Sequence, residues 1–423
     1  MFEVAVIGAG PSGIGVSIIL QKMGVNFTVI DRNNVGSSFL KWPKQMKLLT
    51  PSFFSNTFKM IDLNAITYDT SPALTLQTEH PSGQEYAGYL KKLAEHFKLP
   101  IQGNTNVDSV SKTGDVFTIK TNKGEIKSKY VVWAAGELQY PKIHSFPGSK
   151  HWTHNSLISN WENVQGDEFF VIGGYESGMD TAINLAERKK RVLIIDKDNL
   201  LNSEDIDPSR TISPYTKDRL RRVNTENLIE FHTGRVVRVE KDQHEFIIFT
   251  EKKKIRSKTK PILATGFKGS LSLIKGLFDW EEGKPQLNSF DESTKTPGLY
   301  VTGPMLQSHN MIFCFIYKFQ QRFAVVANNI GIKLSKDVSV IEQYKKEGMY
   351  LDNLEDAKDE CACWRMKILE KNLQECLNEV VWSDNKEDTI YWLGRIHAFM
   401  KMADEHDYEL SLSVKLEKCK VEK

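Results

Sequence analysis

The feature that most constrains this sequence is a strand, glycine turn, helix and strand pattern that occurs twice. The first 31 residues read EVAVIG, AGPSG, IGVSIILQKM and VNFTVID, and residues 168–196 repeat the order as EFFVIG, GYESG, MDTAINLAERK and RVLIID. This order is typical of the βαβ unit that binds a dinucleotide. We therefore predict an α/β fold with two Rossmann-like dinucleotide-binding domains.

The first turn carries the full spacing G-x-G-x-x-G in Gly8, Gly10 and Gly13, directly after one predicted strand and before a predicted helix. The first glycine allows a tight turn, the second lets a pyrophosphate approach the backbone, and the third lets helix and strand pack closely. Asp31 ends the next strand, where a carboxylate accepts hydrogen bonds from ribose hydroxyls. The candidate cofactor-binding residues in this unit are Gly8, Gly10, Pro11, Ser12, Gly13, Asp31 and Arg32.

The second turn departs from this pattern, because Tyr175 stands where the second glycine is expected between Gly173 and Gly178. Three interpretations remain open: the dinucleotide lies further out, the tyrosine swings aside, or this domain no longer binds a nucleotide. Asp196 ends the following strand and would repel a 2′-phosphate, while Lys197 beside it partly offsets that charge. NADH is therefore mildly favoured over NADPH.

Composition excludes several classes of protein. The chain has 423 residues, of which 40% are hydrophobic and 26% charged, and its formal net charge is +2. This balance is that of an ordinary globular protein of two or three domains rather than a disordered or fibrous chain. No apolar run reaches the roughly 18 residues that a membrane helix requires. We expect a cytoplasmic enzyme that acts on a small molecule and binds neither membrane nor nucleic acid.

Further motifs resemble the flavin-containing monooxygenase-like branch of the FAD/NAD(P)-dependent pyridine-nucleotide oxidoreductases, over about residues 1–350. VVWAAG at 131–136 and PILATG at 261–266 are similar to the two segments that pass between the domains of that family. Gly36-Ser37-Ser38-Phe39 with Trp42 is similar to its flavin-side GG-x-W segment. SFFSNTFKM at 52–60 resembles the segment whose asparagine, here Asn56, lies at the reactive edge of the flavin.

The resemblance implies FAD and NAD(P)H as cofactors, an FAD domain split by an inserted NAD(P) domain, and transfer of electrons to oxygen. We expect residues 1–148 and 292–348 to form the FAD-binding domain, 149–291 the NAD(P)-binding domain, and 349–423 a mainly helical C-terminal extension, through which a homodimer or a protein partner could bind. Asn56 is the expected catalytic residue. The further expected cofactor contacts are Ser38, Phe39, Trp42, Val107, Ala135, Gly136, Gly173, Ser177, Gly178, Asp196, Lys197 and Gly303.

Two departures from the family pattern weaken the monooxygenase assignment. The fingerprint F-x-G-x-x-x-H is matched only loosely by Phe146, Gly148 and His154, with two extra residues before the histidine. Gly303 is followed by Pro304 rather than by the aspartate that bonds the ribityl chain in many flavoproteins of the class. Another group must therefore hold the ribityl hydroxyls.

Cysteine positions separate the alternative functions. The sequence has no cysteine before Cys314, so neither thiol pair of the disulfide reductases is present in its usual place. Cys314 is expected to be buried packing. Cys361 and Cys363 are free thiols, a redox pair or two ligands of a soft metal, but they do not make a complete metal site. A thiol-linked reductase, a non-catalytic FAD-binding accessory or sensor protein and a plain NADH oxidase remain alternatives to a monooxygenase.

Overall fold

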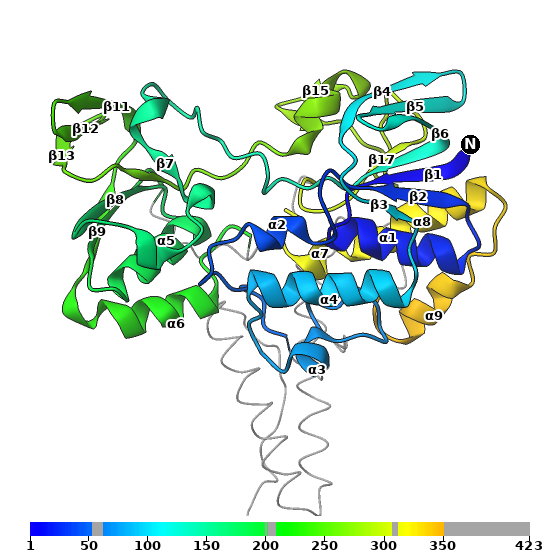
Figure 1. Cartoon of the computed structure of the whole chain (residues 1–423), viewed down its shortest axis with the longest axis horizontal. Coiled ribbons are helices and arrows are strands. Elements are labelled where there is room, and N and C mark those ends of the chain that lie inside the picture. Colours follow the sequence, from blue (N-terminus) through cyan, green and yellow to red (C-terminus); the bar gives the residue numbers. More distant parts are fainter. Residues whose placement is uncertain (53–61, 199–200, 202–208, 307–311, 351–423) are drawn as a thin grey trace, which may run out of the picture.

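The computed structural model describes residues 1–52, 62–198, 201, 209–306 and 312–350. Its first unit is built on a seven-stranded sheet of strand order β3-β2-β1-β6-β5-β4, in which β17 also pairs with β6 (Figure 1). The strands are β1 (Phe2–Ile7), β2 (Phe27–Ile30), β3 (Ile101–Gln102), β4 (Val107–Thr113), β5 (Val116–Thr121), β6 (Gly124–Trp133) and β17 (Leu299–Val301). The long strand β6 pairs in parallel with β1 and β17 and antiparallel with β5, so it joins the nucleotide-type sheet to a hairpin.

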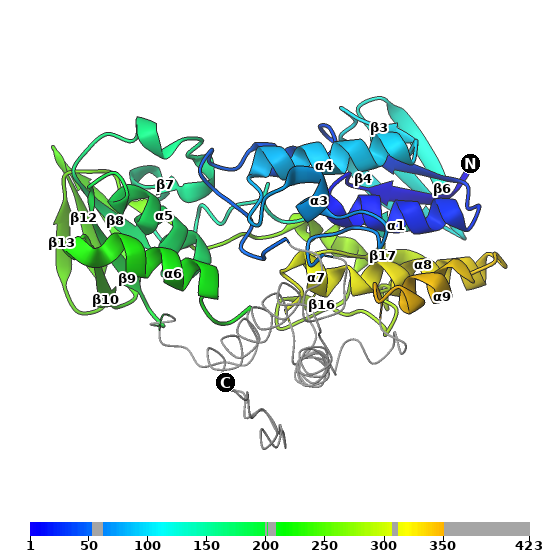
Figure 2. The same ribbon diagram turned by 90° about the horizontal axis from the view of Figure 1, so that it is seen from below.

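Helices of the first unit cover this sheet, and α1 lies between α4 and α8 (Figure 2). Their bounds are α1 (Pro11–Lys22), α2 (Ser37–Leu40), α3 (Pro72–Leu76), α4 (Gly83–His96), α7 (Ile316–Phe319), α8 (Gln321–Lys333) and α9 (Val340–Lys346). α1 begins with proline, whose missing N–H is no loss at the first helical position. α4 begins with a capping box in which Ser82 and Glu85 each bond the other's backbone N–H.

The second unit is a five-stranded parallel sheet of order β10-β9-β8-β14-β7. Its strands are β7 (Thr153–His154), β8 (Glu168–Ile172), β9 (Arg191–Asp196), β10 (Ile229–Thr233) and β14 (Ile262–Leu263), and its α-helices are α5 (Glu176–Ala186) and α6 (Pro214–Val223). A separate three-stranded sheet of β11 (Val236–Asp242), β12 (Glu245–Thr250) and β13 (Lys254–Ser257) packs beside it (Figure 1). The prediction of two Rossmann-like units is therefore confirmed.

The chain crosses between the units twice. After β6 it enters the second unit, and after β14 it returns through the 3-10 segment η6 (Ser270–Leu277) and the hairpin of β15 (Trp280–Glu281) and β16 (Lys284–Pro285) to β17. The first unit is thus split by an inserted second unit, as expected. Leu271, Ile274 and Phe278 already belong to the core of the first unit. The expected domain boundary between residues 291 and 292 stays a prediction. These three side chains come before it in the sequence, although they pack in the core of the first unit.

The remaining short 3-10 segments of the second unit are η1 (Ser149–His151), η2 (Asn155–Leu157), η3 (Trp161–Asn163) and η5 (Asn224–Glu226). Residues 351–423, the greater part of the expected C-terminal extension with Cys361 and Cys363, lie outside the described residues, and so does Asn56. Among the described helices, none is long and apolar enough to cross a membrane.

Candidate functional site

One cavity of about 520 Å³ extends from the glycine turn of the first unit to α5 of the second. The first unit contributes Gly8, Gly10, Asp31, the loop from Trp42 to Thr50, and the segment after β6. The second unit contributes Asn155, Ser156, Leu157, Tyr175 and the first turn of α5. Residues of both predicted dinucleotide-binding turns therefore share one continuous space.

The three glycines of the first turn have different steric reasons to be glycine. A Cβ on Gly8, whose φ is +114°, would lie 2.4 Å from the carbonyl oxygen of Ala134, and a Cβ on Gly13 would lie 1.8 Å from that of Gly8. A Cβ on Gly10 would have no protein atom within 4 Å. Gly8 and Gly13 are therefore required by the fold, whereas Gly10 leaves open space on the cavity wall.

Asp31 is anchored at the end of β2 and faces this turn. Its Oδ2 accepts a hydrogen bond from the backbone N–H of Ala9 at 2.8 Å, and its Oδ1 accepts one from that of Asn33 at 2.7 Å. Burial raises the pKa of Asp31, and the two N–H donors with the nearby Arg32 and Lys41 act in the opposite direction. The carboxylate is thus fixed in orientation beside the turn.

Gln139, which was not predicted from the sequence, forms hydrogen bonds with several polar side chains next to Asp31. Its Oε1 accepts from Arg32 Nη2 at 2.5 Å and from Lys41 Nζ at 3.0 Å, and its Nε2 donates to Ser38 Oγ at 3.1 Å. Two cations that share a neutral amide oxygen keep their positive charge, which favours an anionic or hydroxyl-rich ligand at this end of the cavity.

Among the described residues of the first unit that line the cavity, two carry a buried polar atom without a hydrogen-bond partner. These atoms are the indole N–H of Trp42 and Oδ1 of Asn64. Asn64 is 1% exposed. Its Nδ2 donates to the Thr50 carbonyl oxygen at 2.8 Å and to Ser52 Oγ at 2.7 Å, whereas its Oδ1 has no partner. Because a buried unpartnered polar atom is costly, these atoms fit a ligand that carries both acceptors and donors.

The second turn keeps the packing roles of its outer glycines. A Cβ on Gly173 would lie 2.4 Å from the carbonyl oxygen of Ala264, and one on Gly178 would lie 1.9 Å from that of Gly173. The middle position is Tyr175, which caps α5 and lines the cavity. The fold of the turn is thus preserved while its ligand-facing position is occupied by a side chain.

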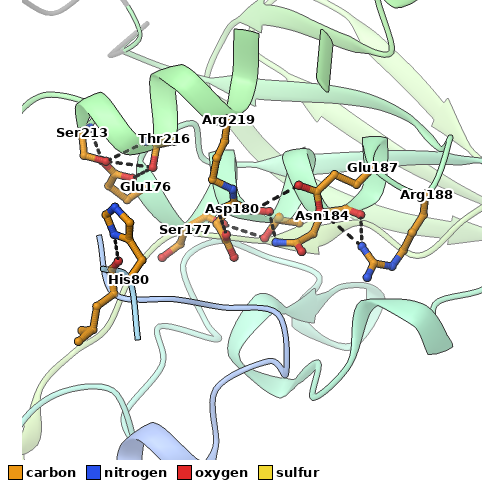
Figure 3. Close-up of polar contacts among 12 residues, drawn as sticks. His80, Glu176, Ser177, Asp180, Asn184, Glu187, Arg188, Ser213, Thr216 and Arg219 are labelled. Carbon is orange, nitrogen blue, oxygen red and sulfur yellow. Dashed lines mark hydrogen bonds and ion pairs between the residues drawn. The ribbon is translucent and has the colours of Figure 1, made fainter. Parts of the chain in front are cut away.

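Two carboxylates on one face of α5 also line the cavity (Figure 3). Glu176 accepts hydrogen bonds from the backbone N–H of Ser213 and from Thr216 Oγ1, both in the first turn of α6. Asp180 accepts from Arg219 Nη1 at 2.6 Å. Burial raises the pKa of both carboxyls, and the donors from α6 lower them in part.

Asp196 ends β9 beside the turn and Lys197 follows it, and neither residue lines the cavity. A Cβ on Gly174 would lie 2.8 Å from Cβ of Asp196, so this acid is pressed against the turn. Lys197 Nζ lies 2.6 Å from Asp198 Oδ2. The Lys197 ammonium group is therefore paired with Asp198 rather than with Asp196.

Glu137 directly follows Gly136 on the cavity wall and is a further residue that sequence reasoning missed. Burial raises its pKa to about 7, and Lys142 lowers it in part. A carboxyl group with this pKa exchanges its proton near neutral pH, which makes Glu137 a candidate acid or base in the cavity.

The structure brings most of the predicted site residues to one place. Those that line the cavity are Gly8, Gly10, Pro11, Ser12, Asp31, Arg32, Ser38, Phe39, Trp42, Val107, Ala135, Gly136 and Ser177. Those that do not are Gly13, Gly173, Gly178, Asp196, Lys197 and Gly303. Gly303 has φ +105°, and a Cβ on it would lie 2.7 Å from Ser12 Oγ. Glycine at this position therefore lets the chain pass close to the first turn.

The loose fingerprint has structural roles in this protein. Phe146 packs on Trp152 with ring centroids 4.4 Å apart, and a Cβ on Gly148 would lie 1.9 Å from the Val239 carbonyl oxygen. His154 Nε2 donates to the carbonyl oxygen of Gly266 at 3.2 Å, at the point where the chain leaves the second unit. Each contact serves the fold of the second unit or its junction.

Cys314 differs from its expectation. It is partly exposed and lines the cavity, and its thiol donates to Ser209 Oγ at 3.1 Å. The prediction of buried packing is therefore wrong, because the turn before α7 faces the cavity rather than the core.

A model of the pyridine nucleotide-disulphide oxidoreductase family matches residues 5–303, which include both glycine turns and both crossings. The chain belongs to this family. FAD and NAD(P)H are the typical cofactors of this family. The resemblance drawn from the motifs is thereby confirmed.

Similar proteins in this family differ in function. The chain is 32% identical over 197 residues to the uncharacterized oxidoreductase CzcO of Bacillus velezensis, covering 45% of this chain and 53% of that protein. It is 27% identical over 205 residues to the senecionine N-oxygenase of Tyria jacobaeae, covering 44% of each. The chain thus spans about half the length of these relatives.

Among solved structures, the fold resembles the bacillithiol disulfide reductase Bdr (YpdA) of Staphylococcus aureus. The TM-score is 0.64 at 18% identity, over 78% of this chain and 98% of that protein. This likeness shows the same two-unit fold.

The residues of the first unit fit FAD. The open space at Gly10 admits a pyrophosphate, Asp31 faces the position of a ribose, and Trp42 and Asn64 offer an unpartnered donor and acceptor. The second turn offers less to a nucleotide, because Tyr175 replaces the glycine that would leave this space.

Proposed function

We propose that this protein is an FAD-dependent oxidoreductase that takes hydride from NAD(P)H and passes the electrons to oxygen, as a flavin monooxygenase does. The observation that carries the proposal is the continuous cavity that joins the open glycine turn of the first unit to α5 of the second. The senecionine N-oxygenase among the similar proteins supports oxygen as the acceptor. When bound, the flavin would supply the redox chemistry.

The protein's own residues would position the cofactor and exclude water. Gly10 and the N-terminus of α1 would face the pyrophosphate, Asp31 would hold the ribose hydroxyls, and Trp42 and Asn64 would bond the polar atoms nearby. Glu137 would hold or release a proton at its carboxyl oxygen near neutral pH. Asn56 stays the proposed catalytic residue at the flavin edge.

NADH is the proposed donor in preference to NADPH. Asp196 stands at the end of β9, and the adjacent Lys197 is paired with Asp198, so little positive charge is left to receive a 2′-phosphate. An acidic residue at this position is typical of dinucleotide-binding motifs that bind a ribose without a 2′-phosphate, so Asp196 supports NADH as the donor.

The test is anaerobic reduction of the purified yellow protein by NADH and NADPH in turn, followed by air with the peroxide quantified. We expect NADH to reduce the flavin faster, and less peroxide than NADH consumed when an oxidisable amine or sulfide is present. NADPH about tenfold faster, equivalent to about 1.4 kcal/mol, would contradict the donor assignment. Peroxide equal to NADH with every such compound would indicate a plain NADH oxidase.

Asn56 is tested by Asn56→Ala in the same assay. We expect FAD content and melting temperature close to wild type, with reduction or oxygen reaction changed about tenfold or more, a cost of about 1.4 kcal/mol or above. Lost stability with unaltered rates per bound flavin would remove Asn56 from the site and favour a simple reductase.

A reductase of a thiol or other acceptor is the second candidate function, because the Cys314 thiol lies on the cavity wall. Cys314→Ser distinguishes the two. A reductase would lose NADH-dependent turnover of a small disulfide such as cystine, whereas a monooxygenase would keep its oxygen consumption.

A further inference from the structure

The two glycine turns of this chain can be compared directly with each other. Gly10, which precedes α1, has φ −88° and ψ −170°, and Tyr175, which precedes α5, has φ −87° and ψ −171°. In both turns the first glycine, Gly8 or Gly173, lies close to a carbonyl oxygen of the crossing segment, and the last glycine lies close to the carbonyl oxygen of the first. The backbone frames are thus the same, and the two turns differ in what they present to a ligand.

The first difference is steric. A Cβ on Gly10 would meet no protein atom within 4 Å, so the space beyond it is available to the cofactor. Tyr175 has the same backbone conformation, and its side chain leaves from the equivalent position and lines the cavity. A pyrophosphate that approached α5 as one approaches α1 would meet this side chain.

The second difference is electrostatic. Pro11 begins α1, whereas Glu176 begins α5 and Asp180 follows one turn later on the same face, and both acids line the cavity. Glu176 is held in place by Ser213 and Thr216 of α6 (Figure 3). A carboxylate in the first turn of a helix occupies the field that would otherwise attract a phosphate.

Of these two acids at the cavity, Asp180 is paired with Arg219, whereas no basic side chain pairs with Glu176 among the described residues. Among the described residues that line the cavity, the second unit contributes no lysine or arginine, and Arg219, which pairs with Asp180, is not a lining residue. The basic lining residues Arg32, Lys41 and Lys47 belong to the first unit. A pyrophosphate with two negative charges is therefore disfavoured at the α5 end by both shape and charge.

Asn155 shows what this end of the cavity can bind instead. It is 2% exposed, lines the cavity from η2, and its Oδ1 has no hydrogen-bond partner in the structure. An amide oxygen in this position accepts from an N–H donor, such as the carboxamide of a nicotinamide.

We propose that the second glycine turn of this protein does not hold the pyrophosphate of a dinucleotide, and that a reduced nicotinamide is recognised by its nicotinamide end. This rests on the proposed function for the identity of the donor. The consequence is that the ADP half of NADH adds little to binding, so the donor preference proposed above would rest on repulsion of the 2′-phosphate by Asp196 and not on attraction of the ADP half.

The binding test is isothermal titration of the FAD-loaded protein with ADP-ribose, which has the pyrophosphate without the nicotinamide. We expect no measurable binding to the wild type up to about 1 mM. The double variant Tyr175→Gly with Glu176→Gln should gain affinity by about tenfold or more, because it reopens the turn and removes the charge. Binding of ADP-ribose to the wild type, or no gain in the variant, would overturn the proposal.

The kinetic test compares anaerobic flavin reduction by NADH and by reduced nicotinamide mononucleotide. A second-order rate ratio below about ten supports the proposal, and a larger ratio in the wild type overturns it. The double variant Tyr175→Gly with Glu176→Gln should raise this ratio, and Glu230→Gln, at an exposed residue of β10 outside the cavity, is the control and should leave the ratio unchanged. If neither donor reduces the flavin, the proposed function fails, and the titration still decides the inference.

Discussion

At the residue scale, the three glycines of one motif are glycine for different reasons. A Cβ on Gly8 or Gly13 would lie 2.4 Å or 1.8 Å from a backbone carbonyl oxygen, so the fold requires glycine at both positions. A Cβ on Gly10 would meet no protein atom within 4 Å. A motif in a sequence shows the spacing of these positions but not which of them the ligand requires. The structure separates those two roles.

This separation predicts opposite outcomes for two substitutions. Gly10→Leu should abolish FAD retention while the apoprotein keeps its melting temperature, because the extended backbone at Gly10 accepts any residue and the side chain enters only the ligand space. Gly13→Ala should destabilise the fold itself, since its Cβ would overlap the Gly8 carbonyl. Flavin absorbance after purification and thermal unfolding measure both effects. Full flavin content in Gly10→Leu would contradict the assignment of this turn to FAD.

Glu137 predicts a pH dependence of stability. Burial raises its pKa from the ordinary 4.5 to about 7, so between these values the folded protein keeps a proton that the unfolded chain has released. The free energy of unfolding therefore falls as the pH rises across this window, by an amount on the order of 2–3 kcal/mol. Glu137→Gln has no such proton to lose and should be more stable relative to wild type at pH 8 than at pH 5.

Urea unfolding of FAD-loaded wild type and Glu137→Gln at these two pH values measures the difference. Glu281→Gln, at an exposed glutamate, is the control and should show the same stability difference from wild type at both pH values. An equal difference for Glu137→Gln at pH 5 and pH 8 would show that Glu137 is ionised as readily in the folded protein as in the unfolded chain.

At the element scale, α1 is fixed by its crossing with α8. A Cβ on Gly15 would lie 2.2 Å from Cε2 of Phe323, a residue of α8 that is 0% exposed. Gly15 lies outside the glycine motif, and its role is to let the two helices approach. Because α1 carries the first turn at its N-terminus, this crossing also positions the candidate FAD site.

Gly15→Ala should therefore destabilise the protein by about 1–3 kcal/mol through overpacking, despite the better helix propensity of alanine. Adding Phe323→Leu should recover part of the loss, because the two changes act on the same contact. Gly88→Ala in α4, where a Cβ would meet nothing within 4 Å, is the matched control and should be neutral or stabilising. Additive effects of the first two changes, measured by chemical unfolding, would mean that the crossing adjusts freely.

At the scale of the whole molecule, side-chain contacts join the two units beside the cavity. The ring of His80 in the first unit stacks on Tyr215 of α6 with centroids 3.7 Å apart, and its Nδ1 bonds the cavity-lining Leu48 carbonyl at 2.8 Å. Gln45 Nε2 donates to Asn160 Oδ1 of the second unit at 2.6 Å. These contacts fix the loop that forms one wall of the cavity.

His80→Ala should therefore increase hydrogen exchange in the Leu48 segment and in the first turn of α6, because the stack and the bond to Leu48 are both lost. Burial lowers the pKa of His80, so acid should have a similar effect as the ring is protonated below its ordinary pKa of 6.5. His151→Ala, at a histidine of the second unit remote from this stack, provides the control. Unchanged exchange in both segments would show that the other contacts suffice to hold the units together.

The insertion of one unit in the other was implied by the family resemblance of the two crossing segments. The sequence patterns themselves predicted the two strand, turn and helix units and the placement of Asp31 beside the first turn. These features depend on short-range patterns of glycine and apolar residues that force a local conformation wherever they occur. Only the tertiary structure decided that Gln139 gathers Arg32 and Lys41, that Glu137 and Cys314 face the cavity, and that α5 presents acids to it. These outcomes depend on which residues, distant in the chain, come into contact, and burial and charge at such contacts follow from packing rather than from spacing.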